Sequence, residues 1–204
     1  MRQVGWRRAV KRAFDVAGAS TGLVLTAPVI GGAAVLVRAT MGSPAFFKQE
    51  RPGLGGRPFR LVKLKTMRNG GPEASLGDDH LRLTKLGTFL RSTSVDELPT
   101  LWNVLAGDMS LVGPRPLLVR YLSRYSHEQA RRHDVLPGLT GWAQVNGRNS
   151  VAWDEKLALD VWYVDHWSLS LDAKILAKTV ATVLRRSGIS HRAHATMPEF
   201  MGPG

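Results

Sequence analysis

The chain has 204 residues, the size of one domain or of one domain with a short appendage, which excludes a multidomain machine. It carries 28 Lys and Arg against 16 Asp and Glu, and the net charge of +12 favours anionic partners such as nucleic acid, phosphorylated substrates or acidic lipid surfaces. The hydrophobic fraction of 44% is enough to fold, and the lack of cysteine excludes disulfides, thiolate metal sites and thiol catalysis.

A long apolar run lies near the N-terminus. Val16 to Val37 contains 22 residues without a charge, about the length of helix that crosses a bilayer core. Basic residues mark the cytoplasmic side of a membrane, and here they flank both ends of the run. They are Arg2, Arg7, Arg8, Lys11 and Arg12 before it, then Arg38, Lys48, Arg51, Arg57, Arg60, Lys63, Lys65 and Arg68.

We therefore expect a re-entrant helix that enters and leaves on one face, with Pro28 as the membrane bend and the Thr26 hydroxyl helping to satisfy the broken backbone. A straight span, a cleaved signal peptide and a buried soluble helix remain alternatives.

Beyond the run, a β-hairpin is predicted from Phe46–Glu50 and Phe59–Leu64, which flank a turn rich in Gly and Pro. Helical stripes follow, and two further helices are predicted over Trp153–Trp167 and Leu171–Arg186. The stripes are Leu83, Leu86 and Leu90; Leu98, Leu101, Trp102 and Leu105; and Leu117, Leu118, Tyr121, Leu122 and Tyr125.

These elements predict a mainly α fold with a small β-hairpin, in which the re-entrant membrane helix joins a compact cytosolic catalytic domain with interfacial helices. The expected divisions are residues 1–40 for the basic N-terminus and membrane helix, 41–189 for the domain, and 190–204 for a loosely ordered tail. Two Trp-rich segments fit either a membrane surface or the core; they contain Trp142, Trp153, Trp162 and Trp167.

Two adjacent carboxylates, Asp96 and Glu97, are predicted to open a helix. By spacing alone, Ser94 and Glu97 fit a capping box, and acids in a first helical turn interact favourably with the helix dipole. The surroundings favour a chemical role, because Arg91 precedes the pair and Arg115 follows it between two prolines, as a stiffly held guanidinium suited to phosphate.

An Asp nucleophile, a Glu that holds Mg²⁺ and arginines on phosphate oxygens make a workable phosphoryl-transfer site. A second metal site at Asp78, Asp79 and His80 competes with a solvated turn, which the neighbouring Gly77 favours. The sequence contains no HExxH motif and no Walker-type loop, which disfavours zinc hydrolases and P-loop nucleotide hydrolases.

Seven blocks in order resemble the bacterial sugar transferases, the monotopic polyprenol-phosphate phosphoglycosyl transferases. The similarity runs from about residue 8 to residue 190. The blocks are Lys11-Arg12-Ala13-Phe14-Asp15, Gln49-Glu50-Arg51-Pro52-Gly53, Lys63-Leu64-Lys65-Thr66-Met67, Asp96-Glu97-Leu98-Pro99, Gly107-Asp108-Met109-Ser110, Gly113-Pro114-Arg115-Pro116, and Pro137 to Arg148.

The resemblance implies transfer of a sugar-1-phosphate from a UDP-sugar to undecaprenyl phosphate, with release of UMP, at the cytoplasmic face of the bacterial inner membrane among its lipids. It implies Asp96 as nucleophile and Glu97 as its partner in holding Mg²⁺. It further implies that Arg115 binds phosphate and that Lys63 or Lys65 and Arg148 contact nucleotide or phosphate. Arg91, by its place just before the carboxylate pair, is a further candidate for substrate binding. The family commonly has Ser-Pro at the bend, where this chain has Ala27-Pro28.

Within the family, the tail resembles that of the N,N′-diacetylbacillosamine-1-phosphate transferases, while UDP-glucose, UDP-galactose and other amino-sugar nucleotides stay open as donors. The tail residues are Arg186 to Ser190, His194, Thr196, Phe200 and Gly202. A homodimer also stays open. A nucleic-acid-binding module is disfavoured because no recognised signature accompanies the charge, and a non-enzymatic membrane scaffold is the remaining alternative.

Overall fold

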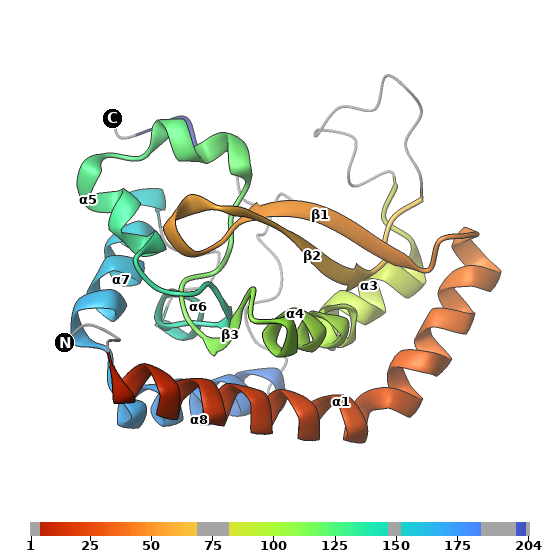
Figure 1. Ribbon diagram of the computed structural model, residues 1–204. Helices are drawn as coiled ribbons and strands as arrows, with labels where there is room; N and C mark the ends of the chain where they lie inside the picture. Colours follow the sequence, from red (N-terminus) through yellow and green to blue (C-terminus); the bar gives the residue numbers. More distant parts are fainter. Residues whose placement is uncertain (1–4, 69–81, 147–151, 185–198, 203–204) are drawn as a thin grey trace.

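A computed structural model describes residues 5–68, 82–146, 152–184 and 199–202 of the chain. As Figure 1 shows, the elements are mostly helices, with short strands between them, and the prediction of a mainly α fold with a small hairpin is confirmed. The helices are α1 (Trp6–Met41), α3 (Lys85–Ser92), α4 (Leu101–Ala106), α5 (His127–Ala130), α6 (Trp142–Asn146), α7 (Trp153–His166) and α8 (Leu169–Leu184). The strands are β1 (Phe46–Pro52), β2 (Pro58–Leu64), β3 (Ser110–Val112) and β4 (Gly138–Thr140). The 3₁₀ turns are η1 (Leu54–Gly56), η3 (Val95–Thr100), η4 (Val119–Arg124) and η5 (Arg131–His133).

Helix α1 contains the apolar run in one bent helix. Among the described residues it is the helix long and apolar enough to cross a membrane, and only 11% of its most apolar stretch is buried inside the protein. In Figure 1 it runs along the base of the molecule and then turns upward. Pro28 lies inside the helix, and the Thr26 hydroxyl donates to the Gly22 carbonyl at 2.7 Å, two features that bend helices. The low burial argues against a core helix.

The predicted hairpin is confirmed, with β1 and β2 antiparallel and Phe46 opposite Leu64. A second sheet was not predicted: β3 and β4 pair in parallel across 25 intervening residues, with Ser110 opposite Gly138 and Val112 opposite Thr140. Strands of three residues are too short to leave a period in the sequence.

None of the three helical stripes lies wholly in an α-helix, and Leu98 of the second stripe lies in the 3₁₀ turn η3. Leu83 bridges to Met67 before α3 begins, and Leu117 and Leu118 precede a 3₁₀ turn rather than belonging to an α-helix. Leu117 and Tyr121 are buried even so. The apolar spacing therefore identified core residues correctly and overestimated the regularity of the backbone.

The N-terminal half of α1 packs closely on the domain because two of its residues have no side chain. A Cβ at Gly18 would lie 2.6 Å from Leu111 Cδ1, and a Cβ at Gly22 would lie 3.0 Å from Leu101 Cδ1. Ala19, on the same face, is fully buried. This small-residue face lets α4 and β3 lie directly against the helix.

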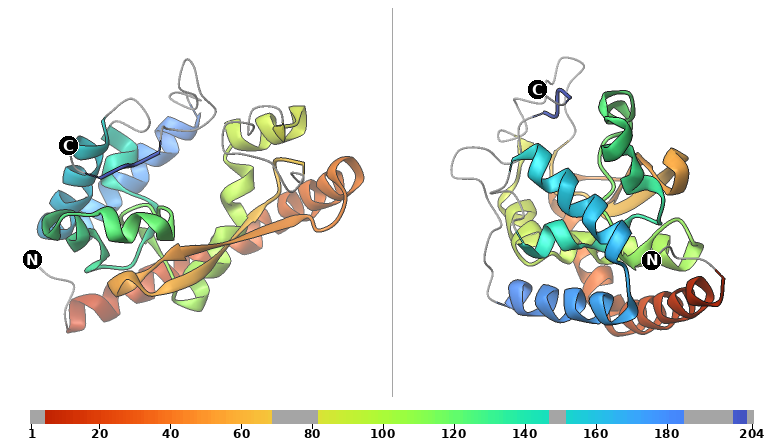
Figure 2. Two further views of the ribbon diagram at one scale, coloured as in Figure 1. Left: turned by 90° about the horizontal axis from the view of Figure 1, so that it is seen from above. Right: turned by 90° about the vertical axis from the view of Figure 1, so that its left-hand side faces the viewer.

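A buried polar network fixes the same half of α1. Lys11 Nζ donates to Asp172 Oδ2 on α8 at 2.6 Å, and Tyr163 and Trp167 donate to the same carboxylate at 2.7 and 3.1 Å. Asp15 Oδ1 accepts from the Ser110 hydroxyl and the Leu111 amide, both at 3.0 Å. The network ties α1 to α7, α8 and β3, and α1 and α8 lie on the same side of the molecule in both Figure 1 and the right-hand view of Figure 2.

All four named tryptophans pack against other residues of the protein. Trp167 is buried and bonded to Asp172, and Trp142 stacks on Trp162, with centroids 4.9 Å apart. Trp153 packs edge-on against Tyr121. The core interpretation holds for Trp167, whereas the most exposed tryptophan on the domain is Trp102 of α4, at 63%.

Two residues of the tail, Glu199 and Phe200, contact the domain, while the expectation of a loosely ordered tail over 190–204 stays a prediction. Phe200 is buried against Tyr121, Tyr125 and Trp153, because three aromatic rings leave a slot that a phenyl group fills. Glu199 accepts from Arg124 at 2.9 Å. Residues 190–198 lie outside the described residues.

The Lys11–Asp172 pair gives a stability test. Lys11→Met leaves a buried carboxylate without its cation, which typically costs on the order of 3 kcal/mol. We expect the melting temperature of the detergent-solubilised protein to fall by roughly 6–12 °C. Arg8→Met, at an exposed position of the same helix, should change it by less than about 2 °C. Equal effects of the two substitutions would contradict a structural role for the pair.

Candidate active site

The site forms where η3 and α4 dock on the edge of β2. Asn103 accepts from the Val62 amide at 3.0 Å and donates to the Arg60 carbonyl at 2.7 Å, while the Thr100 hydroxyl donates to the Val62 carbonyl at 2.9 Å. These side chains satisfy strand groups that a second strand would otherwise pair. The docking holds the turn that carries Asp96 and Glu97 beside Lys63.

The expected capping box is absent. Ser94 adopts a left-handed conformation, with φ 58° and ψ 16°, and its side chain makes no cap hydrogen bond. Its carbonyl accepts from the Glu97 amide at 3.2 Å, so Asp96 and Glu97 lie in a 3₁₀ turn rather than opening an α-helix. The Glu97 side chain is therefore free to face away from the backbone.

Glu97 lies between two cations. Lys63 Nζ donates to Glu97 Oε1 at 2.6 Å, and the Arg115 guanidinium contacts both carboxylate oxygens, donating to Oε2 at 3.2 Å and to Oε1. Burial alone would raise the pKa of Glu97, but Arg115 and Lys63 outweigh it and hold that pKa well below its usual range. Burial lowers the pKa of Lys63, against the pull of Glu97. Three of the predicted site residues thus form one ion-paired cluster.

Asp96 has a different environment from its neighbour. Its side chain is largely buried, with 8% of the residue exposed. Burial and then repulsion by Glu97 raise the pKa of Asp96 to about 6, although Lys63, Arg91 and Arg115 act in the opposite direction. Two adjacent carboxyls with pKa values pushed apart are typical of a catalytic site. At neutral pH, Asp96 is an ionised, poorly solvated carboxylate.

The loop that carries Arg115 is fixed by glycines. A Cβ at Gly138 would lie 2.1 Å from the Gly113 amide nitrogen, and one at Gly141 would lie 2.2 Å from the Gly113 carbonyl oxygen. Only residues without a side chain allow β3 and β4 to approach this closely. The two sequence blocks that contain Gly113 and Gly138 are therefore neighbours in the structure. Strand β3 ends at Val112, and Gly113 leads from it to Pro114 and Arg115.

The other predicted contact residues divide into three groups. Arg91 lies near enough to Asp96 to affect its pKa, and its Nε donates to the Thr66 hydroxyl at 3.1 Å. The Lys65 amino group donates to the Met41 carbonyl at 3.2 Å, so of the two lysines it is Lys63 that meets Glu97. Arg148, and the alternative metal site at Asp78, Asp79 and His80, lie outside the described residues.

Two further cations adjoin the cluster and were not singled out as site residues. Burial, and after it repulsion by Arg115, lower the pKa of Arg51 to about 10 and that of Lys156 to about 8. Arg51 stands within the block Gln49 to Gly53, which could have indicated it. Lys156 lies on α7, next to Trp153, and only the tertiary fold reveals its proximity to Arg115.

The carboxylates fit a magnesium ion. The described residues contain no group of three or more His, Asp or Glu side chains that could hold a metal. Mg²⁺ does not require such a cage, because it commonly binds one or two carboxylates together with phosphate oxygens and water. Glu97 and Asp96 provide that donor set, and a substrate phosphate could replace Glu97 as the partner of Lys63 and Arg115.

This arrangement is suited to phosphoryl transfer. Lys63, Arg51 and Lys156 are all close enough to Arg115 to feel its charge, and such a concentration of positive charge favours a diphosphate. Arg115 offers the planar fork that matches phosphate oxygens. The Asp96 carboxylate lies near these cations, and a carboxylate is one of the side chains that can act as a nucleophile. The geometry therefore combines an anion site with a carboxylate at one face of η3.

Comparisons with known proteins agree with this chemistry. Residues 6–186 match the sequence profile of the bacterial sugar transferases, and the chain belongs to that family. It is a phosphoglycosyl transferase, as the resemblance in the sequence indicated.

Three relatives show the extent of the similarity. The uncharacterized sugar transferase EpsL of Bacillus subtilis (strain 168) is 53% identical over 196 residues, covering 96% of this chain and 97% of the relative. A UDP-glucose:undecaprenyl-phosphate glucose-1-phosphate transferase of Caulobacter vibrioides is 44% identical, covering 85% of this chain and 69% of its own length. An undecaprenyl-phosphate galactose phosphotransferase of Salmonella typhimurium is 38% identical, covering 89% of this chain and 42% of its own length.

The raised pKa of Asp96 predicts a pH-dependent gain in stability for Asp96→Asn. Because the folded protein binds this proton more tightly than the unfolded chain, wild-type stability falls as the pH rises from about 4 to about 6. Asparagine avoids this loss, so we expect the variant to be more stable at pH 7.5 by up to about 3 kcal/mol, and the difference to vanish near pH 4.

Thermal melting in detergent with EDTA, which keeps divalent ions away from Asp96, measures the difference. Asp134→Asn, at an exposed position, serves as the control and should show no such pH dependence. A destabilised Asp96→Asn at pH 7.5 would contradict the inferred environment of Asp96.

Proposed function

We propose that this enzyme transfers a sugar-1-phosphate from a UDP-sugar to undecaprenyl phosphate, releasing UMP, through a covalent phosphosugar intermediate on Asp96. The observation that carries the proposal is the contrast within one turn: Glu97 is ion-paired with Lys63 and Arg115, while Asp96 is buried with a pKa raised to about 6. The names of the relatives support a UDP-sugar as the donor and undecaprenyl phosphate as the acceptor.

In the first half-reaction, an Asp96 carboxylate oxygen attacks the phosphorus that bears the sugar. The bond from that phosphorus to the bridging oxygen breaks, and UMP leaves with the electron pair. Arg115 and Lys63 bind the phosphate oxygens and stabilise the charge that develops on them. Asp96 is suited to this step because burial leaves its carboxylate poorly solvated.

In the second half-reaction, a phosphate oxygen of the lipid attacks the same phosphorus and the Asp96 carboxylate leaves, which produces a lipid diphosphate sugar and restores the enzyme. The two substrates need not occupy the site together. Mg²⁺, when held by Glu97 and Asp96, neutralises diphosphate charge that would otherwise repel the nucleophile. First steps of glycan and glycoconjugate assembly use products of this kind.

The sugar is the open part of the proposal. Two of the relatives described above are named for glucose and galactose, whereas the tail resembles that of diacetylbacillosamine transferases. Of that tail, Phe200 and Gly202 belong to the described residues, and Phe200 packs near α7 rather than at Glu97. UDP-linked glucose, galactose and amino sugars all carry the diphosphate that the cluster of cations is suited to bind.

We further propose that α1 is re-entrant and holds the enzyme at the cytoplasmic face of the bacterial inner membrane. Its support is the bent helix, its basic flanks and its exposed apolar residues. These are Trp6, Phe14, Val24, Leu25, Val29, Val35 and Leu36. Trp102 of α4 and Val180 of α8 are exposed as well and would meet the interface.

The covalent intermediate is tested by intact-protein mass spectrometry. Protein is incubated without lipid, in separate reactions with UDP-glucose, UDP-galactose and UDP-diacetylbacillosamine, and quenched in denaturant. We expect a phosphosugar adduct with the preferred donor, located on Asp96 by fragmentation and accompanied by one equivalent of UMP. The sugar is identified by the donor with which the adduct forms, because the glucose and galactose adducts have the same mass.

Asp96→Asn should form no adduct and should lose turnover by several orders of magnitude, whereas the exposed-site variant Asp134→Asn should behave as wild type. Substantial turnover by Asp96→Asn, or UMP release that strictly requires the lipid, would exclude the covalent route.

The topology is tested with single cysteines, which the natural chain lacks. Arg8→Cys and Ser43→Cys place a thiol at an exposed position on each side of the bend. In intact cells, we expect both to be shielded from a membrane-impermeant thiol reagent and both to react after the membrane is permeabilised. Labelling of only one in intact cells would establish a straight span.

A further inference from the structure

A buried ion pair lies behind the proposed phosphate-binding loop. Arg132 of η5 and Asp160 of α7 are each 2% exposed. Arg132 donates from Nε at 3.1 Å and from one terminal nitrogen at 2.6 Å to the same carboxylate oxygen, Asp160 Oδ2. Burying both charges costs several kcal/mol per ion before their attraction is counted, so a pair of this kind commonly adds little net stability.

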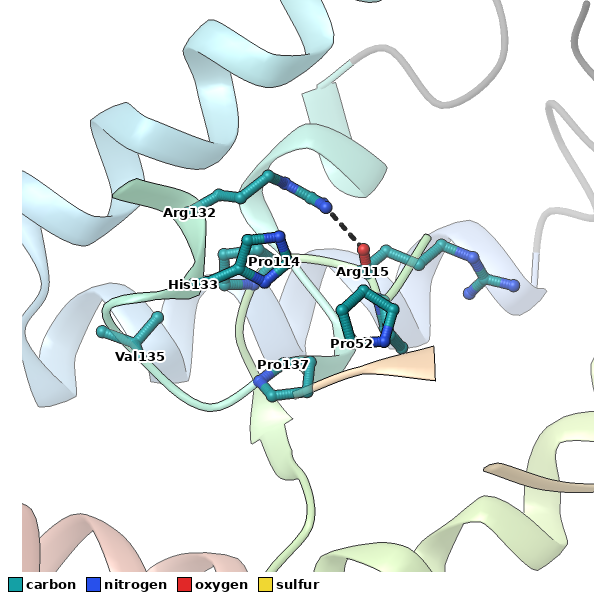
Figure 3. A pocket seen from close by; sticks show the side chains of 8 residues that line it. Pro52, Pro114, Arg115, Arg132, His133, Val135 and Pro137 are labelled. Carbon is teal, nitrogen blue, oxygen red and sulfur yellow. Dashed lines mark hydrogen bonds between the residues drawn. The ribbon is translucent and has the colours of Figure 1, made fainter. Parts of the chain in front are cut away.

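The guanidinium of Arg132 also donates hydrogen bonds to two groups outside the ion pair. The nitrogen that binds Asp160 also donates to the backbone carbonyl of Arg115 at 2.7 Å, and the other terminal nitrogen donates to the Tyr125 hydroxyl at 3.3 Å. Figure 3 shows the bond to the carbonyl, with the Arg115 guanidinium pointing in the opposite direction, away from Arg132.

This contact completes the fixation of the Arg115 backbone. Gly113 and Pro114 are held from one side, since the Gly113 amide donates to Thr140 and the Pro114 carbonyl accepts from Gly138. Proline at 116 restricts the residue before it. With its carbonyl also bound, Arg115 retains freedom mainly in its side chain, which is the part that reaches Glu97.

We propose that Arg132 and Asp160 are positioning residues that orient Arg115 for anion binding: Asp160 fixes the guanidinium of Arg132, and Arg132 fixes the carbonyl of Arg115. Neither residue touches the substrate. The inference rests on the proposed function of Arg115 and adds the device that holds it in place. Preorganisation matters because a displacement of about 1 Å can cost on the order of 100-fold in rate.

The central variant is Arg132→Lys. Lysine retains a positive charge for Asp160 but has one nitrogen in place of three, so it cannot hold Asp160 and the Arg115 carbonyl in the same geometry. Arg131→Lys is the matched control. The neighbouring Arg131 is ion-paired with Asp165, which lies on α7 as Asp160 does, but the ion pairs of Arg131 lie at the surface. Asp160→Asn gives a second variant, which preserves side-chain shape and removes the charge that fixes Arg132.

The experiment is a double-mutant cycle on the full, detergent-solubilised protein. The ratio kcat/KM for the preferred UDP-sugar is measured for Arg132→Lys, Asp160→Asn and Arg131→Lys, each in wild-type and in Arg115→Lys backgrounds. We expect Arg132→Lys and Asp160→Asn to lower kcat/KM at least tenfold in the wild type and less than threefold in the Arg115→Lys background. Arg131→Lys should change it less than twofold in both.

The outcomes separate this inference from the function on which it rests. An equal loss in both backgrounds would mean that Arg132 and Asp160 act only through general stability, and would overturn their positioning role while leaving Arg115 in place. An unimpaired Arg115→Lys variant would instead overturn the phosphate-binding role of Arg115. If Arg132→Lys shows no cooperative melting, the same comparison with Asp160→Asn decides between these results.

Discussion

A carboxylate removed from water needs cations, and the architecture around Glu97 follows from that requirement. Lys63 comes from β2, Arg115 from the loop after β3, and Glu97 itself from a 3₁₀ turn docked on β2 by Asn103 and Thr100. Three segments separated by up to 52 positions in the sequence meet at one carboxylate. The two small sheets and their glycines serve mainly to bring these segments together.

The cluster also carries a cost that suits an enzyme. Lys63, Arg51 and Lys156 all have lowered pKa values, chiefly from burial and further from the charge of Arg115, so the cations repel one another more than surface residues would. A bound diphosphate relieves that repulsion. The free enzyme thus holds its charges ready for the substrate at the expense of its own stability, as is common in preorganised sites.

The sequence predicted the hairpin, the long helices and the enzyme family, because those depend on periodicity and on short runs of adjacent residues. The spacing of Ser94 and Glu97 predicted a capping box that the structure does not contain, because spacing does not reveal that the backbone of Ser94 is left-handed. Nor could the sequence reveal that Gly113 and Gly138 lie against each other, or that Arg132 reaches Arg115, since such contacts arise only in the folded chain. The packing of Phe200 against other aromatic residues could not be predicted either, because a single aromatic residue produces no periodic pattern in the sequence.

The bond between Lys11 and Asp172 joins residues 161 positions apart, and this separation orders the events of biosynthesis. At a translation rate of about 5–20 residues per second, Lys11 is synthesised roughly 8–32 s before Asp172. During that interval α1 has no α8 to pack against, and β3 is added only partway through it, so the small-residue face and two charges of α1 must be accommodated by water, lipid or a chaperone. Helix α1 is thus synthesised before the elements on which it docks, and its docking is completed only after α8 has emerged.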